Sequence, residues 1–301
     1  MQLAKSDINI RVIVAFAAIY ILWGTTFLAI RIAVLEFPPL LTAGLRFFIA
    51  GTLLYAFMRL RGQANPSPMH WRNLALISVC MFVITYGAVF WAEQFVSSGV
   101  TSVIEATLPI TTIILEMFVF RTQPFRGPLF AAVVFGFFGV ALMFIDNRAQ
   151  QLAILPCLAI LLGGVAWSVG AVLSGQLALP RSKPLTAGAQ MMIGGLILLL
   201  LSAVSGEMRP LPHLSLRVGL ALIYLVVFGS LIAYTAYVWL LGRMPVTTVA
   251  SHAYINPLVA VALGYFIAGE IVTLRTLIAA MVVLGSVVLI LTRAPSRLTP
   301  S

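Results

Sequence analysis

Charge is scarce in this 301-residue sequence: charged residues make up 9% and hydrophobic residues 61%, and the mean hydropathy is +1.09. A soluble domain is about half apolar and about a quarter charged. The composition therefore excludes an ordinary soluble protein. It predicts an all-α polytopic membrane protein, because helices satisfy their own backbone hydrogen bonds in lipid. A chain of this length accommodates about ten spans of roughly 20 residues, which leaves no room for a second soluble domain.

Cysteine is also scarce, and catalytic motifs are lacking. The two cysteines, Cys80 and Cys157, lie inside apolar runs, so we interpret them as packing residues and not as a disulfide framework. The sequence has no H-E-x-x-H, G-x-S-x-G or Walker motif. No histidine or cysteine pair has the spacing of metal ligands, so we predict no metal site and no cofactor. These absences argue against an enzyme and against an ATP-driven pump.

Apolar runs separated by turn residues predict ten membrane-spanning helices. The expected ranges are 12–32, 38–58, 73–94, 99–120, 127–145, 152–175, 186–204, 217–241, 246–268 and 273–292. The first run lacks a clear cleavage site and is followed by many more spans. We therefore expect it to be a helix of the protein and not a targeting peptide.

The net charge of +10 is unevenly distributed. Twelve lysines and arginines lie at one set of span ends, five lie at the opposite ends, and Arg46 lies within a span. The positive-inside rule then predicts that both short tails, 1–11 and 293–301, are cytoplasmic, in a bacterial-type cell (inner) membrane. Anionic lipid accounts for the cationic bias, so we predict no nucleic-acid partner.

The sequence also repeats itself. The paired positions are Trp23 with Trp167 and Arg46 with Gln190 at an offset of 144, then Tyr86 with Tyr234 and Pro109 with Pro257 at an offset of 148. Each unit holds five expected spans, and an odd number makes the two units cross the membrane in opposite senses. We therefore predict two inverted five-helix repeats, 12–145 and 152–292. This arrangement is typical of secondary transporters with a substrate site near the bilayer midplane.

Several motifs resemble a known family. WGTTFLAIRIAV at 23–34 and ASHAYINPLVAVALGYFIAGE at 250–270 resemble the two EamA repeats of the drug/metabolite transporter superfamily, and AEQFVSSGVTSVIEATLPI at 92–110 is most similar to its YedA-like exporters. The resemblance implies ten helices and a central cavity lined by helices one, three, four, six, eight and nine. It implies a cavity open to one side at a time and export of small metabolites or drugs. Members of the family commonly carry a small apolar residue where Glu105 stands.

The span at 99–120 carries Glu105 and Glu116 in an otherwise apolar helix. An intramembrane carboxylate costs about 2.5 kcal/mol or more and usually faces a cavity or a partner. Glu105 has three interpretations. It is a proton-coupling or substrate-contact site, a fixed partner of Arg46, which lies at similar depth in the span 38–58, or a carboxyl group in a polar cavity without a role of its own. Arg46 is alternatively a contact for an anionic substrate group. For Glu116 we expect a position at the cytoplasmic interface.

Aromatic and polar side chains complete the candidate cavity set. Its other members are Trp23, Thr26, Tyr86, Trp167, Tyr234, His252 and Asn256. Aromatic walls suit amphipathic or cationic substrates. His252 and Asn256 lie four residues apart on one helix face, either to bind substrate or to bond helices together. Pro109 and Pro257 are predicted helix hinges, because proline removes a backbone hydrogen bond.

These observations predict a secondary active transporter that exports small metabolites or drugs by alternating access. Amino acids and amphipathic or cationic compounds are the expected substrates, with proton coupling left open. The alternatives are a nucleotide-sugar or organic-anion carrier, a non-transporting membrane sensor and an intramembrane enzyme. The sequence leaves open whether the chain works alone or as a homodimer.

Overall fold

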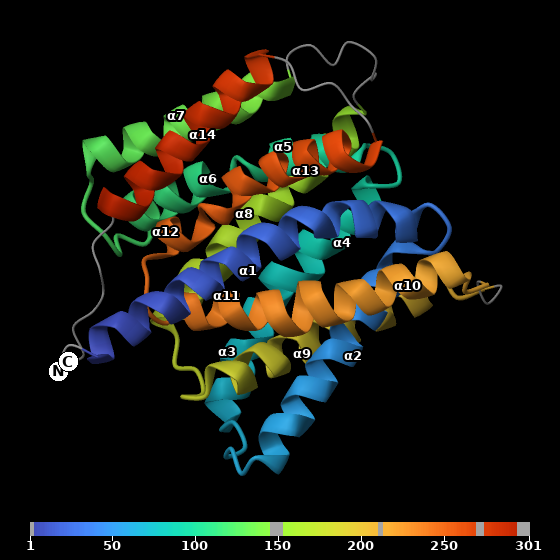
Figure 1. Cartoon of the computed structure of the whole chain (residues 1–301). Coiled ribbons are helices and arrows are strands. Elements are labelled where there is room, and N and C mark those ends of the chain that lie inside the picture. The colour runs from blue at the N-terminus through green and yellow to red at the C-terminus, as the bar shows by residue number, and fades with distance from the viewer. Residues whose placement is uncertain (1–2, 145–152, 210–212, 269–273, 294–301) are drawn as a thin grey trace.

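The computed structural model describes residues 3–144, 153–209, 213–268 and 274–293, and all regular structure within these ranges is helical (Figure 1). The prediction of an all-α membrane protein is therefore confirmed. In the described chain, seven helical runs are long and apolar enough to cross a membrane: Ile10–Val34, Pro39–Leu60, Pro68–Ala92, Ser98–Val119, Ile154–Gln176, Lys183–Val204 and Leu216–Leu241. Shorter apolar helices cover Gly127–Gly139 and Ile278–Ile290.

The elements follow one another with short connections. In the first half they are α1 (Leu3–Val34), α2 (Pro39–Leu60), α3 (Pro68–Ser78), η1 (Val79–Ile84), α4 (Thr85–Ala92), α5 (Ser98–Glu105), α6 (Leu108–Ile114), η2 (Leu115–Val119) and α7 (Gly127–Phe144). In the second half they are α8 (Ile154–Gln176), α9 (Lys183–Val204), α10 (Leu216–Tyr224), η3 (Leu225–Ile232), α11 (Ala233–Leu241), α12 (Val246–Ala250), α13 (His252–Ala268) and α14 (Leu274–Arg293). The three η segments are π-helical turns within longer helices.

Serine side chains begin several of these helices. Ser67 and Ser215 accept hydrogen bonds from backbone N–H groups at the starts of α3 and α10, and Ser97 and Ser182 do the same for α5 and α9. Such N-caps satisfy donors that the helix itself leaves free. Ser67 and Ser215 are 148 positions apart, so the caps of α3 and α10 follow the offset of the sequence repeat.

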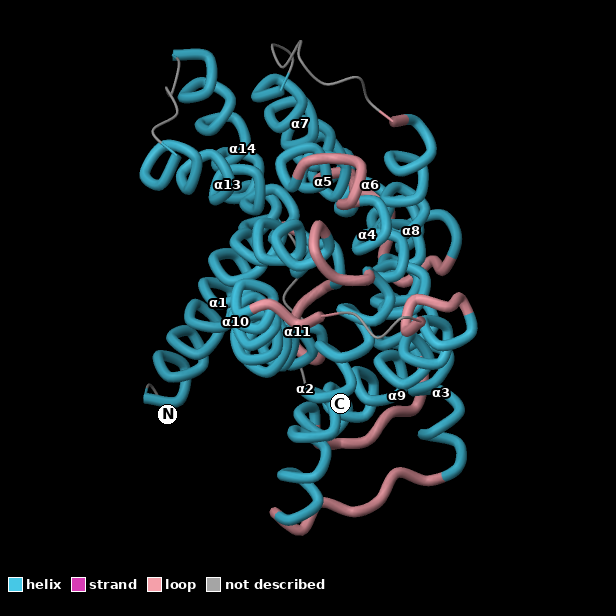
Figure 2. The backbone as a smooth tube through the Cα atoms, turned by 90° about the vertical axis from the view of Figure 1, so that its right-hand side faces the viewer, coloured by secondary structure: helices cyan, strands magenta, loops and turns pink. Residues whose placement is uncertain are grey.

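Two helix pairs flank the bundle. The α2–α9 pair lies at one edge and the α7–α14 pair at the opposite edge (Figures 1 and 2). Between them α1 packs on α13 and α11, and α4 packs on α8. α2 of the first repeat corresponds to α9 of the second, and α7 corresponds to α14. Each flanking pair therefore joins two repeat-related helices.

Glycines let α2 and α9 approach each other closely. A Cβ on Gly188 would stand 2.7 Å from the backbone nitrogen of Tyr55, and one on Gly44 would stand 2.9 Å from that of Leu199. Gly44 and Gly188 are 144 positions apart, as are Tyr55 and Leu199. Low numbers on one helix face high numbers on the other, so α2 and α9 run antiparallel.

The molecule is apolar outside and carries polar groups inside. Large hydrophobic side chains such as Leu60, Phe138 and Val204 are exposed, whereas Arg46 and many serines and threonines are buried. This inverts the pattern of a soluble protein, in which buried charges are rare and contiguous apolar surface is limited. The exterior therefore matches a hydrocarbon solvent.

The helix that contains Glu105 is broken. α5 ends at Glu105, α6 begins at Leu108, and Pro109 lies in the first turn of α6. In the second half the break falls at Ser251, between α12 and α13, whereas Pro257 lies inside α13. Pro109 thus lies beside the first break, whereas Pro257 lies six positions after Ser251.

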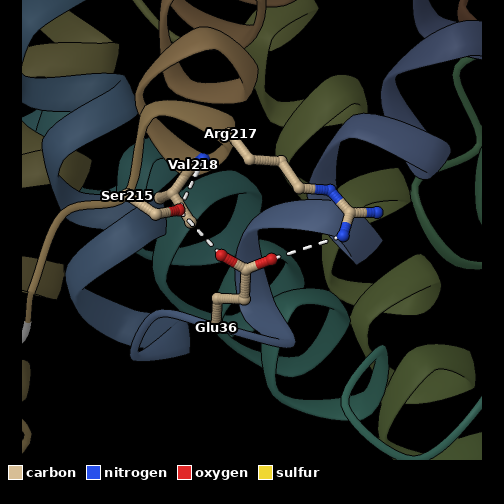
Figure 3. Close-up of polar contacts among 4 residues, drawn as sticks. All are labelled: Glu36, Ser215, Arg217 and Val218. Carbon is tan, nitrogen blue, oxygen red and sulfur yellow. Dashed lines mark hydrogen bonds and ion pairs between the residues drawn. The ribbon is translucent and has the colours of Figure 1, made fainter.

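One exposed ion pair joins the two halves of the chain at the α1–α2 turn (Figure 3). Glu36 Oε1 lies 3.4 Å from Arg217 Nη1, and Ser215 Oγ donates to Glu36 Oε2 at 2.7 Å. Ser215 Oγ also accepts from the backbone N–H of Val218 at 3.2 Å. The N-cap of α10 is thus held against the end of α1.

Candidate functional site

A small cavity lies at the centre of the bundle, where both halves of the chain meet. It has room of about 30 Å³. Its walls are Trp23, Thr26, Phe27 and Ile30 from α1, Thr85, Tyr86 and Val89 from α4, Glu105 from α5, Trp167 from α8, and His252 and Asn256 from α13. A water needs about 10–15 Å³ of such space and a drug-sized ligand about 300–1,000 Å³. The cavity therefore has room for very few water molecules and none for a ligand of metabolite size.

Seven predicted site residues meet in this cavity: Trp23, Thr26, Tyr86, Glu105, Trp167, His252 and Asn256. They come from helices far apart in the sequence, and α10–α11, expected from the family resemblance, supplies no lining side chain. Tyr237 of α11 lies behind the wall instead, with its ring 5.1 Å from that of Trp23.

Aromatic rings build one wall. The Trp23 ring lies 5.7 Å from that of Trp167 and 4.7 Å from that of His252, both edge to face. The Trp23 indole N–H donates to the backbone carbonyl of Gly229 at 3.0 Å, which locks the ring in place. Edge-to-face aromatic pairs contribute about 0.5–1.5 kcal/mol beyond their buried area. The wall is therefore rigid, as a recognition surface requires.

Several polar atoms of the lining are buried without a hydrogen-bond partner among the described residues. They are Trp167 Nε1, His252 Nδ1 and Nε2, and Asn256 Oδ1. The Tyr237 hydroxyl is a polar neighbour of Trp167, but Trp167 Nε1 lacks hydrogen-bonding geometry to any acceptor described. Buried polar groups are normally satisfied by protein, water or ligand. The lining thus presents donors and acceptors to whatever occupies the cavity.

Arg46 stands behind this lining. Its Nε donates to Ser230 Oγ at 2.9 Å, and its guanidinium lies 4.5 Å from the ring centre of Phe47 and 5.2 Å from that of Tyr86. No described ion pair joins Arg46 to Glu105. The fixed-partner interpretation of Glu105 therefore has no bond to support it in this conformation, and aromatic faces surround the cation instead.

Tyr234, the repeat counterpart of Tyr86, lies outside the cavity. Its hydroxyl donates to Gln190 Oε1 at 2.8 Å. Gln190 is the counterpart of Arg46, so the two halves build the same contact between the same helices. One half uses a cation over a ring and the other a neutral hydrogen bond.

Glu116 corrects a prediction. Its side chain is only 1% exposed. Glu116 Oε2 accepts from the backbone N–H of Thr247 at 3.0 Å and from Gln123 Nε2 at 2.8 Å, and it also bonds the Thr247 hydroxyl. The carboxylate caps the start of α12 and does not extend to the interface. Sequence spacing misses this because the partner lies 131 residues away.

Glu93 is the residue that sequence reasoning missed. It follows the last residue of α4, yet it is fully buried, and neither side-chain oxygen has a hydrogen-bond partner in the described part of the chain. At the end of a predicted span a glutamate suggests an exposed interfacial charge. Only the packing of other helices on α4, α1 and α2 among them, encloses it.

Two larger grooves lie elsewhere and are lined mainly by apolar side chains. One, of about 390 Å³, includes Ile154 and Leu158, and the other, of about 430 Å³, includes Leu220 and Leu263. Ile154, Leu158 and Leu220 are exposed on the apolar exterior. These grooves therefore face lipid, and the central cavity is the candidate site.

Comparison with known proteins agrees with this architecture. The sequence pattern of the EamA-like transporter family matches residues 10–145 and 154–292, and the chain belongs to this family. It is 36% identical over 284 residues to the inner membrane transporter YedA of Escherichia coli K12, covering 92% of this chain and 89% of that one. It is 26% identical over 281 residues to a WAT1-related chloroplastic protein of Arabidopsis thaliana, covering 90% of this chain and 67% of that protein.

A solved crystal structure shares the fold. It superposes with a TM-score of 0.75 at 18% sequence identity, covering 93% of this chain and 96% of the other. The family membership and the apolar exterior together show that the protein is a multi-pass membrane transporter. It transports a small molecule and lies in a lipid bilayer.

Proposed function

We propose that the protein is a secondary active transporter that exports small cationic or amphipathic compounds, amino acids included, by alternating access. Its ten spans form two inverted repeats, 12–145 and 152–292, in an inner membrane of bacterial type with both termini cytoplasmic. The antiparallel contact of α2 with α9 supports this arrangement, because a two-fold axis in the membrane plane relates helices in that way.

The composition of the cavity carries the substrate class. Rings of Trp23 and Trp167 form an aromatic wall, and Glu105 is the one carboxyl group in the lining. Aromatic faces and a carboxylate together bind an ammonium or another organic cation. Arg46 lies behind the lining and not in it. Among the residues described, the lining therefore offers an organic anion or a nucleotide sugar no cationic side chain to bind.

The size of the cavity supports alternating access. Room of about 30 Å³ admits no metabolite, so substrate must enter through another conformation. Trp23 on α1 and Trp167 on α8 are repeat-related, and they meet edge to face across the centre. Separating the two halves on one side would open the cavity toward that side alone.

Counterflow in proteoliposomes tests the proposal. Purified protein is loaded with unlabelled lysine, leucine, ribose or ethidium, and uptake of the labelled compound is followed. We expect saturable, trans-stimulated flux of lysine or ethidium. We expect Glu105→Gln to reduce it at least about tenfold, which corresponds to about 1.4 kcal/mol of binding free energy. Glu36→Gln, which removes an exposed carboxyl group, is the control. No trans-stimulated flux for any compound would contradict the proposal.

A further inference from the structure

A second buried carboxyl group lies just beyond the end of α4. The side chain of Glu93 is 0% exposed, and both of its oxygens lack a hydrogen-bond partner among the described residues. Glu93 is absent from the cavity lining, so substrate does not satisfy it. The site described above therefore leaves this group without a role.

Three charged groups interact electrostatically with Glu93, and none of them is hydrogen-bonded to its carboxyl group in the described chain. They are Arg31 from α1, Arg46 from α2 and Glu105 from α5. Arg31 donates to the backbone carbonyls of Glu93 and Val96, the latter at 3.0 Å, which caps the end of α4. The other helical segments packed on α4, which are α8 and η1, bring no charged side chain.

The nearby hydroxyl and guanidinium groups do not hydrogen-bond to the Glu93 carboxyl group. The Thr101 hydroxyl is a polar neighbour of the Glu93 carboxyl group, but it donates to the backbone carbonyl of Ser97 at 3.2 Å and lacks hydrogen-bonding geometry to Glu93. Arg46 Nε donates to Ser230, and no described residue offers Nη1 or Nη2 an acceptor of hydrogen-bonding geometry. The Glu93 carboxyl oxygens and the Arg46 Nη1 and Nη2 groups are thus buried and interact electrostatically, but they are not hydrogen-bonded to each other.

An unpaired buried carboxylate is strongly unfavourable, because its lost hydration is not replaced. A bound proton removes that charge. Building on the transport function proposed above, we propose that Glu93 is protonated in this closed conformation and is the carboxyl group that couples transport to H⁺. When the cavity opens to the cytoplasm, the proton passes to water on that side and the Glu93 carboxylate pairs with Arg46. When the cavity opens to the opposite side, water there returns a proton to Glu93, so each cycle moves one proton inward as a substrate cation moves outward. Glu105 then binds the substrate cation, and Glu93 carries the proton.

Infrared spectroscopy of reconstituted protein tests the protonation directly, without substrate. A Glu105→Gln background removes the other carboxyl group of the region. In this background at pH 7 we expect a protonated carboxyl C=O band that shifts in D₂O. We expect the band to disappear when Glu93→Gln is added and to remain when Glu36→Gln is added. A missing band, or a band unchanged by Glu93→Gln, would overturn the proposal.

Coupling is measured separately in proteoliposomes with labelled lysine. Glu93→Gln should retain counterflow. The accumulation of lysine driven by an imposed pH gradient should fall at least about tenfold in this variant. Glu93→Asp, which keeps a carboxyl group, should retain both the band and the accumulation, so a folding defect is distinguished from loss of the proton site. Gradient-driven accumulation by Glu93→Gln would overturn the coupling role. Failure of lysine counterflow in the unmodified protein would instead count against the proposed function and leave the infrared result standing.

Discussion

Gly51 of α2 and Gly195 of α9 lie 144 positions apart, and each rests against the backbone of the other helix. A Cβ on Gly51 would overlap the backbone nitrogen of Met192, and one on Gly195 would overlap that of Phe48. Two repeat-related glycines thus set the distance between the most closely packed helices of the bundle. Backbone atoms cannot turn aside as a flexible side chain can.

Gly51→Ala and Gly195→Ala should therefore each destabilise the protein by about 1–3 kcal/mol, since overpacking forces the helices apart. Thermal unfolding in detergent, followed by size-exclusion chromatography, measures the effect. Gly164→Ala is the matched control, because that glycine is also buried in a helix but has no atom within 4 Å of an added Cβ. Equal losses for Gly164→Ala and Gly51→Ala would refute the packing argument.

The cap on α12 leads to a second prediction. Glu116→Ala leaves the buried N–H of Thr247 without its acceptor, and this should cost about 1–3 kcal/mol. Thr247→Val removes only the hydroxyl and keeps the backbone bond, so it should cost less, about 0.5–1.5 kcal/mol. Melting temperatures of the two variants give the order. If Thr247→Val proves the more damaging, the backbone cap is not the main role of Glu116.

The indole N–H of Trp167 should matter for binding and little for folding. Trp167→Phe keeps an aromatic ring and removes a buried donor that has no acceptor among the residues described. We expect a loss of substrate affinity of roughly five- to tenfold, or about 1 kcal/mol, with the melting temperature nearly unchanged. Ethidium binding followed by fluorescence provides the measurement. Trp91→Phe, at a half-buried tryptophan outside the cavity lining, should leave binding unaltered.

The ion pair between Glu36 and Arg217 should contribute little stability. The side chains are 38% and 66% exposed, and exposed pairs are typically worth about 0.2–1 kcal/mol and weaken as salt rises. A double-mutant cycle with Glu36→Gln and Arg217→Gln at low and high salt measures the coupling. A coupling energy above about 2 kcal/mol, insensitive to salt, would show that this pair is more than a surface contact.

Several features of the molecule follow from local sequence. Hydrophobicity and turn residues predicted the membrane class and the approximate limits of most helices, because a chain in lipid must satisfy its backbone within each span. The repeated Trp, Tyr and Pro positions indicated which helices of the two halves correspond. Seven of the candidate site residues were identifiable because a polar or aromatic side chain inside an apolar helix usually faces a cavity or a partner.

Other features depend on which helices meet, and sequence distance does not encode this. The sequence left pairing with Arg46 open as one interpretation of Glu105, whereas in the structure Arg46 lies over aromatic rings behind Tyr86. In the structure Glu116 is a buried cap of α12. Glu93 is a buried carboxyl group at the end of α4 without a hydrogen-bond partner among the described residues. Burial and pairing of a charge are set by atoms from several helices at once. Composition, periodicity and the repeat therefore determined the class, the approximate spans and most of the cavity wall, whereas tertiary packing decided which carboxyl groups are bonded and which are left alone.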